Sequence, residues 1–186
     1  MHEIEVLINR LREQGKTLVL AESCTAGLVA DLMGRIPGVS NVLWGSFVCY
    51  TAQAKCVMLD LDPVRLQKYG LVSRETACDM ACSALVKSGA SLAAAVTGIA
   101  GPDSDESGLA AGTVWIATAL RVAAPQKPVA AAPQKPVAAT PGLTVDALAA
   151  QPLARLYQFS GSRNEVREQA ARALVRDLLK ALDKCV

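Results

Sequence analysis

The sequence predicts an α/β fold, in which a mixed β-sheet flanked by helices forms a single layered domain. Short apolar runs typical of buried strands alternate with stretches whose apolar residues recur at helical spacing, and this alternation favours parallel strands joined by helices. Some strands also follow one another with no helix between them, which favours antiparallel neighbours. The 186 residues suffice for one domain with its own core, since domains commonly hold roughly 100–200 residues.

The chain begins with a predicted helix, because apolar residues recur at helical spacing from Ile4 to Leu11 among charged ones. This mixture differs from the basic region and apolar block of a secretory leader, so we expect a cytoplasmic protein. Residues 17–22 are an apolar run too short for a helix and are predicted as a buried strand. A turn of small residues at 23–27 leads into a second helix that ends before Pro37.

The middle of the chain continues the alternation. Residues 42–51 are predicted as a strand rich in aromatic and β-branched residues, with Gly45 marking a bulge. A short helix is predicted at 63–68, and a longer one begins after Ser73, whose hydroxyl is suited to cap its first turn. The alanine-rich run 91–96 is predicted as a strand buried on both faces.

The last third of the chain adds two strands and a long helix. Residues 112–120 and 153–159 have the β-branched and aromatic content of strands. The sequence SRNE at 162–165 is a capping box, in which serine and glutamate each satisfy a backbone N–H at a helix start. The helix that it opens is predicted to run to Leu182.

A Pro/Ala/Lys-rich insertion at about 122–140 interrupts the domain. It contains the eight-residue unit APQKPVAA twice, at 124–131 and 132–139. Such a tract cannot build a packed core, so we expect it to be extended and exposed, with the docking of a proline-recognising partner as the alternative. The predicted organisation is therefore one domain over residues 1–186 with this insertion between two strands.

Composition argues against two classes of partner. The chain carries 19 basic and 17 acidic side chains, and this net charge of +2 provides no electrostatic reason to expect nucleic acid or an anionic membrane. The longest run without charge, residues 36–54, contains proline, glycine and several hydroxyl-bearing residues that lipid would leave unsatisfied. No membrane-spanning helix is predicted.

Six cysteines and one histidine limit the possible chemistry. The cysteines, at positions 24, 49, 56, 78, 82 and 185, lie mostly in apolar or helical stretches and are expected to be buried thiols. Cys78 and Cys82 have the spacing to share a metal, but there is no second pair and His2 stands at the terminus, so we expect no metal site. A hydrolase built from this chain would use a lysine, a carboxylate or a bound water as its base.

Small and hydroxyl-bearing residues gather at the predicted strand ends. Ser23 and Thr25 follow the first strand, Ser40 precedes the second, and Thr97 and Gly98 follow the third. The carboxyl ends of strands in an open α/β sheet bind ligands, and free N–H groups there attract anions, so we expect a phosphate-bearing small molecule. Ordinary helix caps use the same residue types, and the chain contains neither a dinucleotide fingerprint nor a P-loop motif.

Lys55 is the lysine most closely surrounded by apolar sequence. Burial disfavours the charged form of a lysine, and a neutral amine can act as a base toward a serine. The alternative is that its stem lies along apolar surface while its ammonium group reaches water. Spacing alone leaves both interpretations open.

Five motifs together resemble the CinA C-terminal domain family. They are ESCTAG at 22–27, Tyr50 with Lys55 five residues later, GLVS at 70–73, TGIAGPD at 97–103 and GTVW at 112–115. The resemblance covers residues 3–121 and 153–182, in the order and at the spacings of that family's stand-alone nicotinamide mononucleotide (NMN) deamidases. TGIAGPD is the most specific of the five.

The resemblance implies an amidohydrolase of pyridine nucleotide salvage that converts NMN and water to nicotinic acid mononucleotide and ammonia, without a cofactor or metal. It implies a serine and a lysine as catalytic residues, with Ser40 and Lys55 at the matching positions and Ser23 as the reserve nucleophile. Tyr50 and Thr97 are the other polar residues of the pocket. The expected substrate contacts are Thr25, Gly27, Gly98, Arg163 and Arg167, although ordinary surface charge is the alternative for the arginines. A homo-oligomer is also implied.

Several positions depart from the family pattern. Ala26 stands where the family has a glycine, which would cost stability or affinity if the backbone there has positive φ. Residues 104–105 and 110–111 replace a glycine pair and a Pro-Val pair. Since a fold does not guarantee its chemistry, a non-catalytic nucleotide-binding or interaction domain is the alternative function.

Overall fold

The structure is a computed structural model that describes residues 2–105, 108–121 and 152–183. The predicted insertion and Cys185 lie outside these residues. In chain order the elements are α1 (His2–Glu13), β1 (Leu18–Glu22), α2 (Leu28–Gly34), the short 3₁₀ helix η1 (Val39–Asn41), β2 (Leu43–Val48), α3 (Ala52–Leu59), α4 (Pro63–Tyr69), α5 (Arg74–Ser88), β3 (Leu92–Gly98), β4 (Thr113–Leu120), β5 (Leu153–Gln158) and α6 (Arg163–Asp183).

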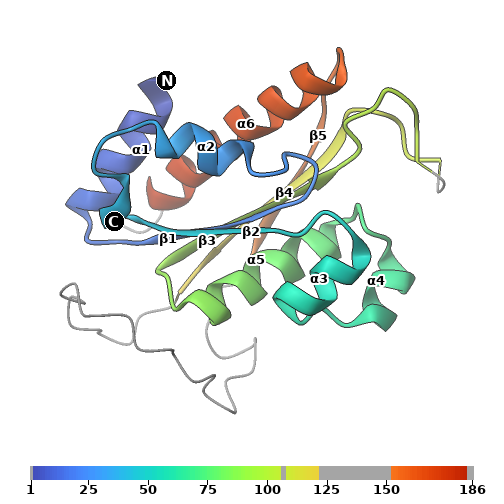
Figure 1. Cartoon of the computed structure of the whole chain (residues 1–186), viewed down its shortest axis with the longest axis horizontal. Coiled ribbons are helices and arrows are strands. Elements are labelled where there is room, and N and C mark those ends of the chain that lie inside the picture. Colours follow the sequence, from blue (N-terminus) through green and yellow to red (C-terminus); the bar gives the residue numbers. More distant parts are fainter. Residues whose placement is uncertain (1, 106–107, 122–151, 184–186) are drawn as a thin grey trace.

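One mixed sheet forms the middle layer, with the strand order β2-β1-β3-β4-β5. β2, β1 and β3 are parallel, whereas β4 pairs antiparallel with both β3 and β5. Helices α1, α2 and α6 cover one face of the sheet, and α3, α4 and α5 cover the other (Figure 1). The predicted α/β fold with a mixed sheet between helices is confirmed.

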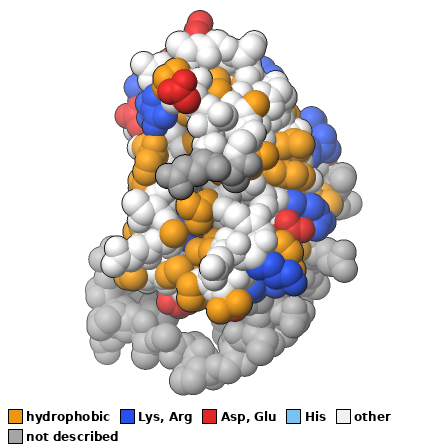
Figure 2. Space-filling model, turned by 90° about the vertical axis from the view of Figure 1, so that its right-hand side faces the viewer, with side chains coloured by type: hydrophobic (Ala, Val, Ile, Leu, Met, Phe, Trp, Pro, Cys, Tyr) orange, Lys and Arg blue, Asp and Glu red, His pale blue; other side chains and the backbone are white. Residues whose placement is uncertain are grey.

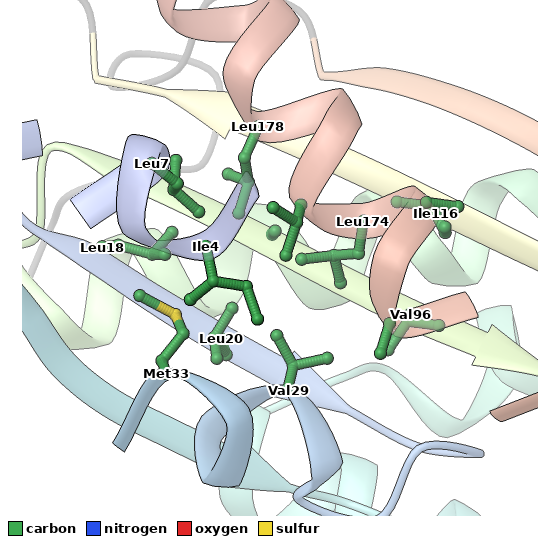
Figure 3. Packing of buried hydrophobic residues seen from close by; sticks show 14 of the residues in the cluster. Ile4, Leu7, Leu18, Leu20, Val29, Met33, Val96, Ile116, Leu174 and Leu178 are labelled. Carbon is green, nitrogen blue, oxygen red and sulfur yellow. The ribbon is translucent and has the colours of Figure 1, made fainter. Parts of the chain in front are cut away.

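The two faces of β1 show how the sequence divides the core. Leu18 and Leu20 pack with α1, α2 and α6, where Figure 3 shows them among the side chains of these helices. Val19 and Ala21 point to the opposite face and pack against α5. Because successive side chains of a strand face opposite sides, a continuous apolar run can serve both layers. Burying a side chain such as Leu20 contributes about 1.5–3 kcal/mol.

Most predicted elements are confirmed with small shifts at their ends. Ser73 accepts a hydrogen bond from the Thr76 N–H at the start of α5, and Ser162 and Glu165 form the capping box before α6. The register of β1 against β2 shifts beside Gly45, which confirms the predicted bulge. β3 extends to Gly98, so Thr97 and Gly98 belong to the strand rather than to the loop after it.

The predicted strand at 42–51 is too long. β2 ends at Val48, and Thr51 instead caps α3 by accepting a hydrogen bond from the Ala54 N–H. The apolar pattern gave no warning, because only Lys55 and Leu59 of this short helix are buried. In the described part of the chain, no helix has the length and apolar character needed to cross a membrane.

Candidate functional site

The carboxyl ends of β1 and β3 border a cavity of about 400 Å³. Parallel pairing produces this arrangement, because the two strands run in the same direction and end side by side. Sites for small molecules commonly measure roughly 300–1,000 Å³. The polar side chains that line the cavity include Ser23, Tyr50, Lys55, Thr97, Asp103 and Arg163.

Figure 2 shows the molecule from the side on which these strand ends lie. Hydrophobic and uncharged atoms occupy much of the middle of this face, and charged side chains lie mostly toward its margins.

Ser23 and Lys55 form a buried pair in the cavity. Lys55 Nζ donates to Ser23 Oγ at 2.8 Å and to the Cys49 carbonyl oxygen at 2.9 Å. The lysine is only 1% exposed, so its amine does not reach water. Desolvation lowers the pKa of Lys55 from its ordinary value. A lysine held in this way, within hydrogen-bonding distance of a serine hydroxyl, is suited to act as a general base.

Glu22 fixes the turn that presents Ser23. Its fully buried carboxylate accepts hydrogen bonds from the N–H groups of Val29 and Ala30, at 3.1 and 3.0 Å, and from Ser46 Oγ at 3.0 Å. These bonds join the end of β1 to the start of α2 and to β2. Charge-assisted hydrogen bonds are stronger than neutral ones, so a single side chain ties three elements beside the cavity.

The turn contains a residue in the left-handed region. Ala26 has a φ of 51°, and Gly27 follows with a φ of 89°. Glycine adopts such values without strain, whereas an L-residue with a Cβ pays a steric cost. The departure at Ala26 therefore falls where a glycine would be unstrained.

Thr25 and Gly27 belong to this turn, Arg167 contacts it from α6, and none of the three lines the cavity. Arg167 donates from Nη2 to the Thr25 carbonyl oxygen at 2.9 Å and from Nη1 to Asn164 Oδ1. Thr25 is fully buried, and Gly27 precedes the first turn of α2. These three expected substrate contacts instead hold the turn in place.

Arg163 reaches the cavity from the start of α6. Its Nη1 donates to the Gly101 carbonyl oxygen at 2.8 Å, and its Nη2 donates to the Tyr50 hydroxyl. The guanidinium thus joins the segment after β2 to the loop after β3. A guanidinium has five N–H donors, so donors remain for an anionic ligand.

Thr97 and Gly98 form the part of β3 that lines the cavity. The Thr97 hydroxyl donates to the Leu71 carbonyl oxygen at 2.8 Å and so anchors the segment before α5. A Cβ at Gly98 would lie 2.7 Å from the Thr113 carbonyl oxygen and from Val114 Cγ2. Glycine is therefore required here by the close approach of β4, in addition to any contact with a ligand.

Ser40 is not part of the cavity, which corrects its expected role opposite Lys55. It lies exposed in η1, directly before the amino end of β2, whereas Lys55 follows the carboxyl end of that strand. Six residues of strand at about 3.3 Å each separate the two ends by roughly 20 Å. The serine beside the lysine is Ser23, which we had expected only as the reserve nucleophile.

The cysteines near the pair are poor nucleophiles. Burial raises the pKa of the Cys24 thiol to about 11, and it raises the pKa of the Cys49 thiol to about 11 as well. The predicted burial is confirmed for Cys24, Cys49, Cys78 and Cys82, whereas Cys56 is only half-buried. In the described ranges, no group of three histidine, cysteine or acidic side chains has the arrangement of a metal site.

Among the residues in and beside the site, sequence reasoning did not single out Glu22 or Asp103. Both stand within motifs that carry the family resemblance, ESCTAG and TGIAGPD. The acidic residue at the end of an otherwise apolar strand was the available signal for Glu22, because a buried carboxylate needs several donors.

Comparison with known proteins agrees with the family resemblance of the motifs. A family model described as the CinA C-terminal domain matches residues 2–130. A CinA-like protein from Chlorobium phaeovibrioides is 43% identical over 124 residues, which are 67% of this chain and 29% of that protein. A putative competence-damage inducible protein from Lacticaseibacillus casei is 34% identical over 176 residues, which are 95% of this chain and 36% of that protein. The chain thus spans about a third of the length of these relatives.

Solved structures resemble the chain over nearly its whole length. The competence/damage inducible protein CihA from Agrobacterium tumefaciens superposes with a TM-score of 0.75 and 32% identity, covering 97% of this chain and 96% of that chain. A protein of the competence-damaged protein (CinA) superfamily from Escherichia coli has a TM-score of 0.78 and 27% identity, covering 96% and 88%.

Proposed function

We propose that this chain, which belongs to the CinA C-terminal domain family, is an amidohydrolase that converts NMN and water to nicotinic acid mononucleotide and ammonia. The reaction would take place in the cytoplasm, as part of pyridine nucleotide salvage and without a metal. The observation that carries the proposal is the 2.8 Å contact between Lys55 Nζ and Ser23 Oγ in a cavity of mononucleotide size.

Ser23 is the proposed nucleophile. With the Lys55 amine neutral, the Ser23 hydroxyl donates its proton to the nitrogen lone pair as Oγ attacks the carboxamide carbon. The resulting lysine ammonium then protonates the departing amide nitrogen, which leaves as ammonia. Water, deprotonated in turn by Lys55, hydrolyses the ester and restores Ser23, so the base and the nucleophile return unchanged.

The surroundings of the pair support this order of events. The Cys49 carbonyl oxygen, 2.9 Å from Lys55 Nζ, accepts a hydrogen bond from the amine and so aims it at the serine. Low exposure keeps water from competing for the lysine proton. The adjacent Cys24 does not compete as nucleophile, because the pKa of its thiol is raised and the thiolate is scarce at neutral pH.

An ammonia-release assay with NMN tests the proposal. The unmodified protein is expected to release ammonia and form nicotinic acid mononucleotide in equal amounts. Ser23→Ala and Lys55→Met should each lower turnover by at least ~100-fold, the low end for the loss of a general base. Ser40→Ala is the matched control and should remain close to the unmodified protein, since Ser40 lies outside the cavity.

Two results would contradict the proposal. Near-normal turnover by folded Lys55→Met or Ser23→Ala protein would exclude the serine and lysine mechanism. Binding of NMN without release of ammonia would instead identify the chain as a non-catalytic nucleotide-binding domain. Circular dichroism of each variant separates loss of chemistry from loss of fold.

A further inference from the structure

The polar side chains that line the cavity differ in whether they already have a hydrogen-bond partner within the protein. Ser23 bonds Lys55, and Thr97 bonds the Leu71 carbonyl oxygen. Arg163 bonds both Tyr50 and the Gly101 carbonyl oxygen. Every one of these groups already has a partner within the protein.

Asp103 differs from them. It lines the same cavity and is exposed, and its carboxylate forms no hydrogen bond or ion pair with the residues that the structure describes. Its neighbour in the loop, Asp105, instead accepts a hydrogen bond from the Leu109 N–H at 2.9 Å and so closes the loop on itself. The Asp103 carboxylate is thus an acceptor that faces the cavity with its lone pairs available.

Depth in the cavity indicates which part of a mononucleotide Asp103 would meet. Ser23 and Lys55 are buried, at 7% and 1% exposed, so the carboxamide that reacts there lies deep. Arg163 and Asp103 are both exposed, and Arg163 bonds the carbonyl of Gly101, two residues before Asp103. A phosphate held by Arg163 therefore places the adjoining ribose beside this loop. A carboxylate is a well-known acceptor for ribose hydroxyl groups.

We propose that Asp103 is a specificity residue that accepts hydrogen bonds from the 2′- and 3′-hydroxyl groups of the substrate ribose. This inference rests on the proposed mononucleotide substrate, and it adds selection for a ribonucleotide over a deoxyribonucleotide or a free nicotinamide. Asp103 takes no part in the transfer of protons at Ser23.

Direct binding provides a test that does not depend on turnover. The ligands are nicotinic acid mononucleotide and its 2′,3′-dideoxy analogue, measured by calorimetry. The unmodified protein should bind the ribonucleotide at least ~10-fold more tightly than the dideoxy analogue, because hydrogen bonds to a charged group are the stronger kind. Asp103→Ala should remove this preference by weakening the ribonucleotide alone. Ser104→Ala, in the same loop and outside the cavity lining, should keep the preference.

The outcomes separate this inference from the proposed function. A hydroxyl-dependent preference that disappears in Asp103→Ala supports the inference even if the protein releases no ammonia, in which case only the proposed reaction fails. Equal affinity of the unmodified protein for both ligands, or binding of neither, overturns the inference. Equal weakening of both ligands by Asp103→Ala also overturns it, since the carboxylate would then act on the loop or on overall charge.

Discussion

The proposed chemistry of this site depends on the buried Lys55. Lys55 is withdrawn from water although its side chain costs free energy to desolvate. Its two hydrogen-bond partners, Ser23 and the Cys49 carbonyl, orient the amine without adding a full negative charge. Because no carboxylate in the described part of the chain is hydrogen-bonded to Lys55, desolvation dominates and lowers its pKa, which favours the neutral amine.

The lowered pKa of Lys55 predicts a specific pH dependence. The value of kcat/KM should rise with pH as the amine loses its proton and should level off below the ordinary lysine range of about 10.4. The free energy of unfolding should also rise with pH. Between the folded pKa and about 10.4, the unfolded chain binds a proton that the folded chain lacks, so unfolding free energy rises with pH.

Urea unfolding of the unmodified protein and Lys55→Met across this window measures the effect. The unfolding free energy of Lys55→Met, minus that of the unmodified protein, should be largest at neutral pH and should fall as the pH approaches about 10.4. The exposed lysine variant Lys68→Met is the control and should show a constant difference. An advantage of Lys55→Met that does not vary with pH would contradict desolvation of the amine.

Ala26 is the second residue whose local conformation has a measurable cost. Its φ of 51° costs an L-residue about 1–2 kcal/mol, whereas glycine pays only about 0.5–1 kcal/mol in chain entropy. Ala26→Gly should therefore raise unfolding free energy by roughly 0.5–1 kcal/mol. Chemical denaturation provides the measurement. The control is Ala30→Gly in the adjoining helix α2, which should lower the unfolding free energy by a similar amount. A lower unfolding free energy in both variants would argue against strain at Ala26.

At the scale of elements, the carboxylate of Glu22 joins β1, α2 and β2. It accepts hydrogen bonds from two backbone N–H groups and one hydroxyl, and a side chain with fewer acceptors would leave at least one of these donors unpaired. The segment between β1 and α2 is thereby held from one side by Glu22 and from the other by Arg167 on the Thr25 carbonyl. This double restraint keeps Ser23 within reach of Lys55.

Glu22→Gln tests the restraint. An amide keeps one acceptor oxygen but turns an NH₂ group toward a donor, so unfolding free energy should fall by about 2 kcal/mol, within the range for hydrogen bonds to charged groups. Turnover should fall with it, since Ser23 would no longer be fixed. Glu3→Gln, which weakens an exposed ion pair with Arg176, is the matched control and should cost less than ~1 kcal/mol. Equal losses in urea unfolding would refute a special role for Glu22.

At the scale of the whole molecule, the cavity is assembled from segments far apart in the chain. Arg163, at the start of the last helix, bonds Tyr50 after β2 and Gly101 after β3. The sheet brings these together because β1, β2 and β3 are parallel and end at the same edge. α6 then crosses the sheet with its first turn beside that edge (Figure 1).

Arg163→Ala tests whether this long-range contact serves the substrate phosphate. The variant should lose at least ~10-fold in kcat/KM for NMN, as for one charge-assisted hydrogen bond, because remote binding energy supports the reaction. Nicotinamide riboside keeps the carboxamide and lacks the phosphate, so its kcat/KM should hardly change. A steady-state comparison of both substrates decides the matter: equal losses would assign Arg163 a purely structural role in joining the two loops.

Local patterns in the sequence determined most of the elements. Each signal involves only residues near one another in the chain, so it is visible in a short stretch of sequence. These signals are the helical spacing of apolar residues, the Ser73 cap and the capping box at 162–165. The short helix α3 was missed because only two of its eight residues are buried, which leaves little apolar periodicity to recognise. The family motifs likewise located the segments that form the site.

Only the tertiary structure decided which serine meets the lysine. The family resemblance pointed to Ser40, and with Ser40 15 positions and Ser23 32 positions before Lys55, distance along the chain gave no reason to prefer Ser23. In space, β2 runs between Ser40 and the cavity, whereas its parallel neighbour β1 ends at Ser23 beside the lysine. The pairing of strands is set by the burial of both sheet faces, a property of the complete core that no short stretch of residues contains.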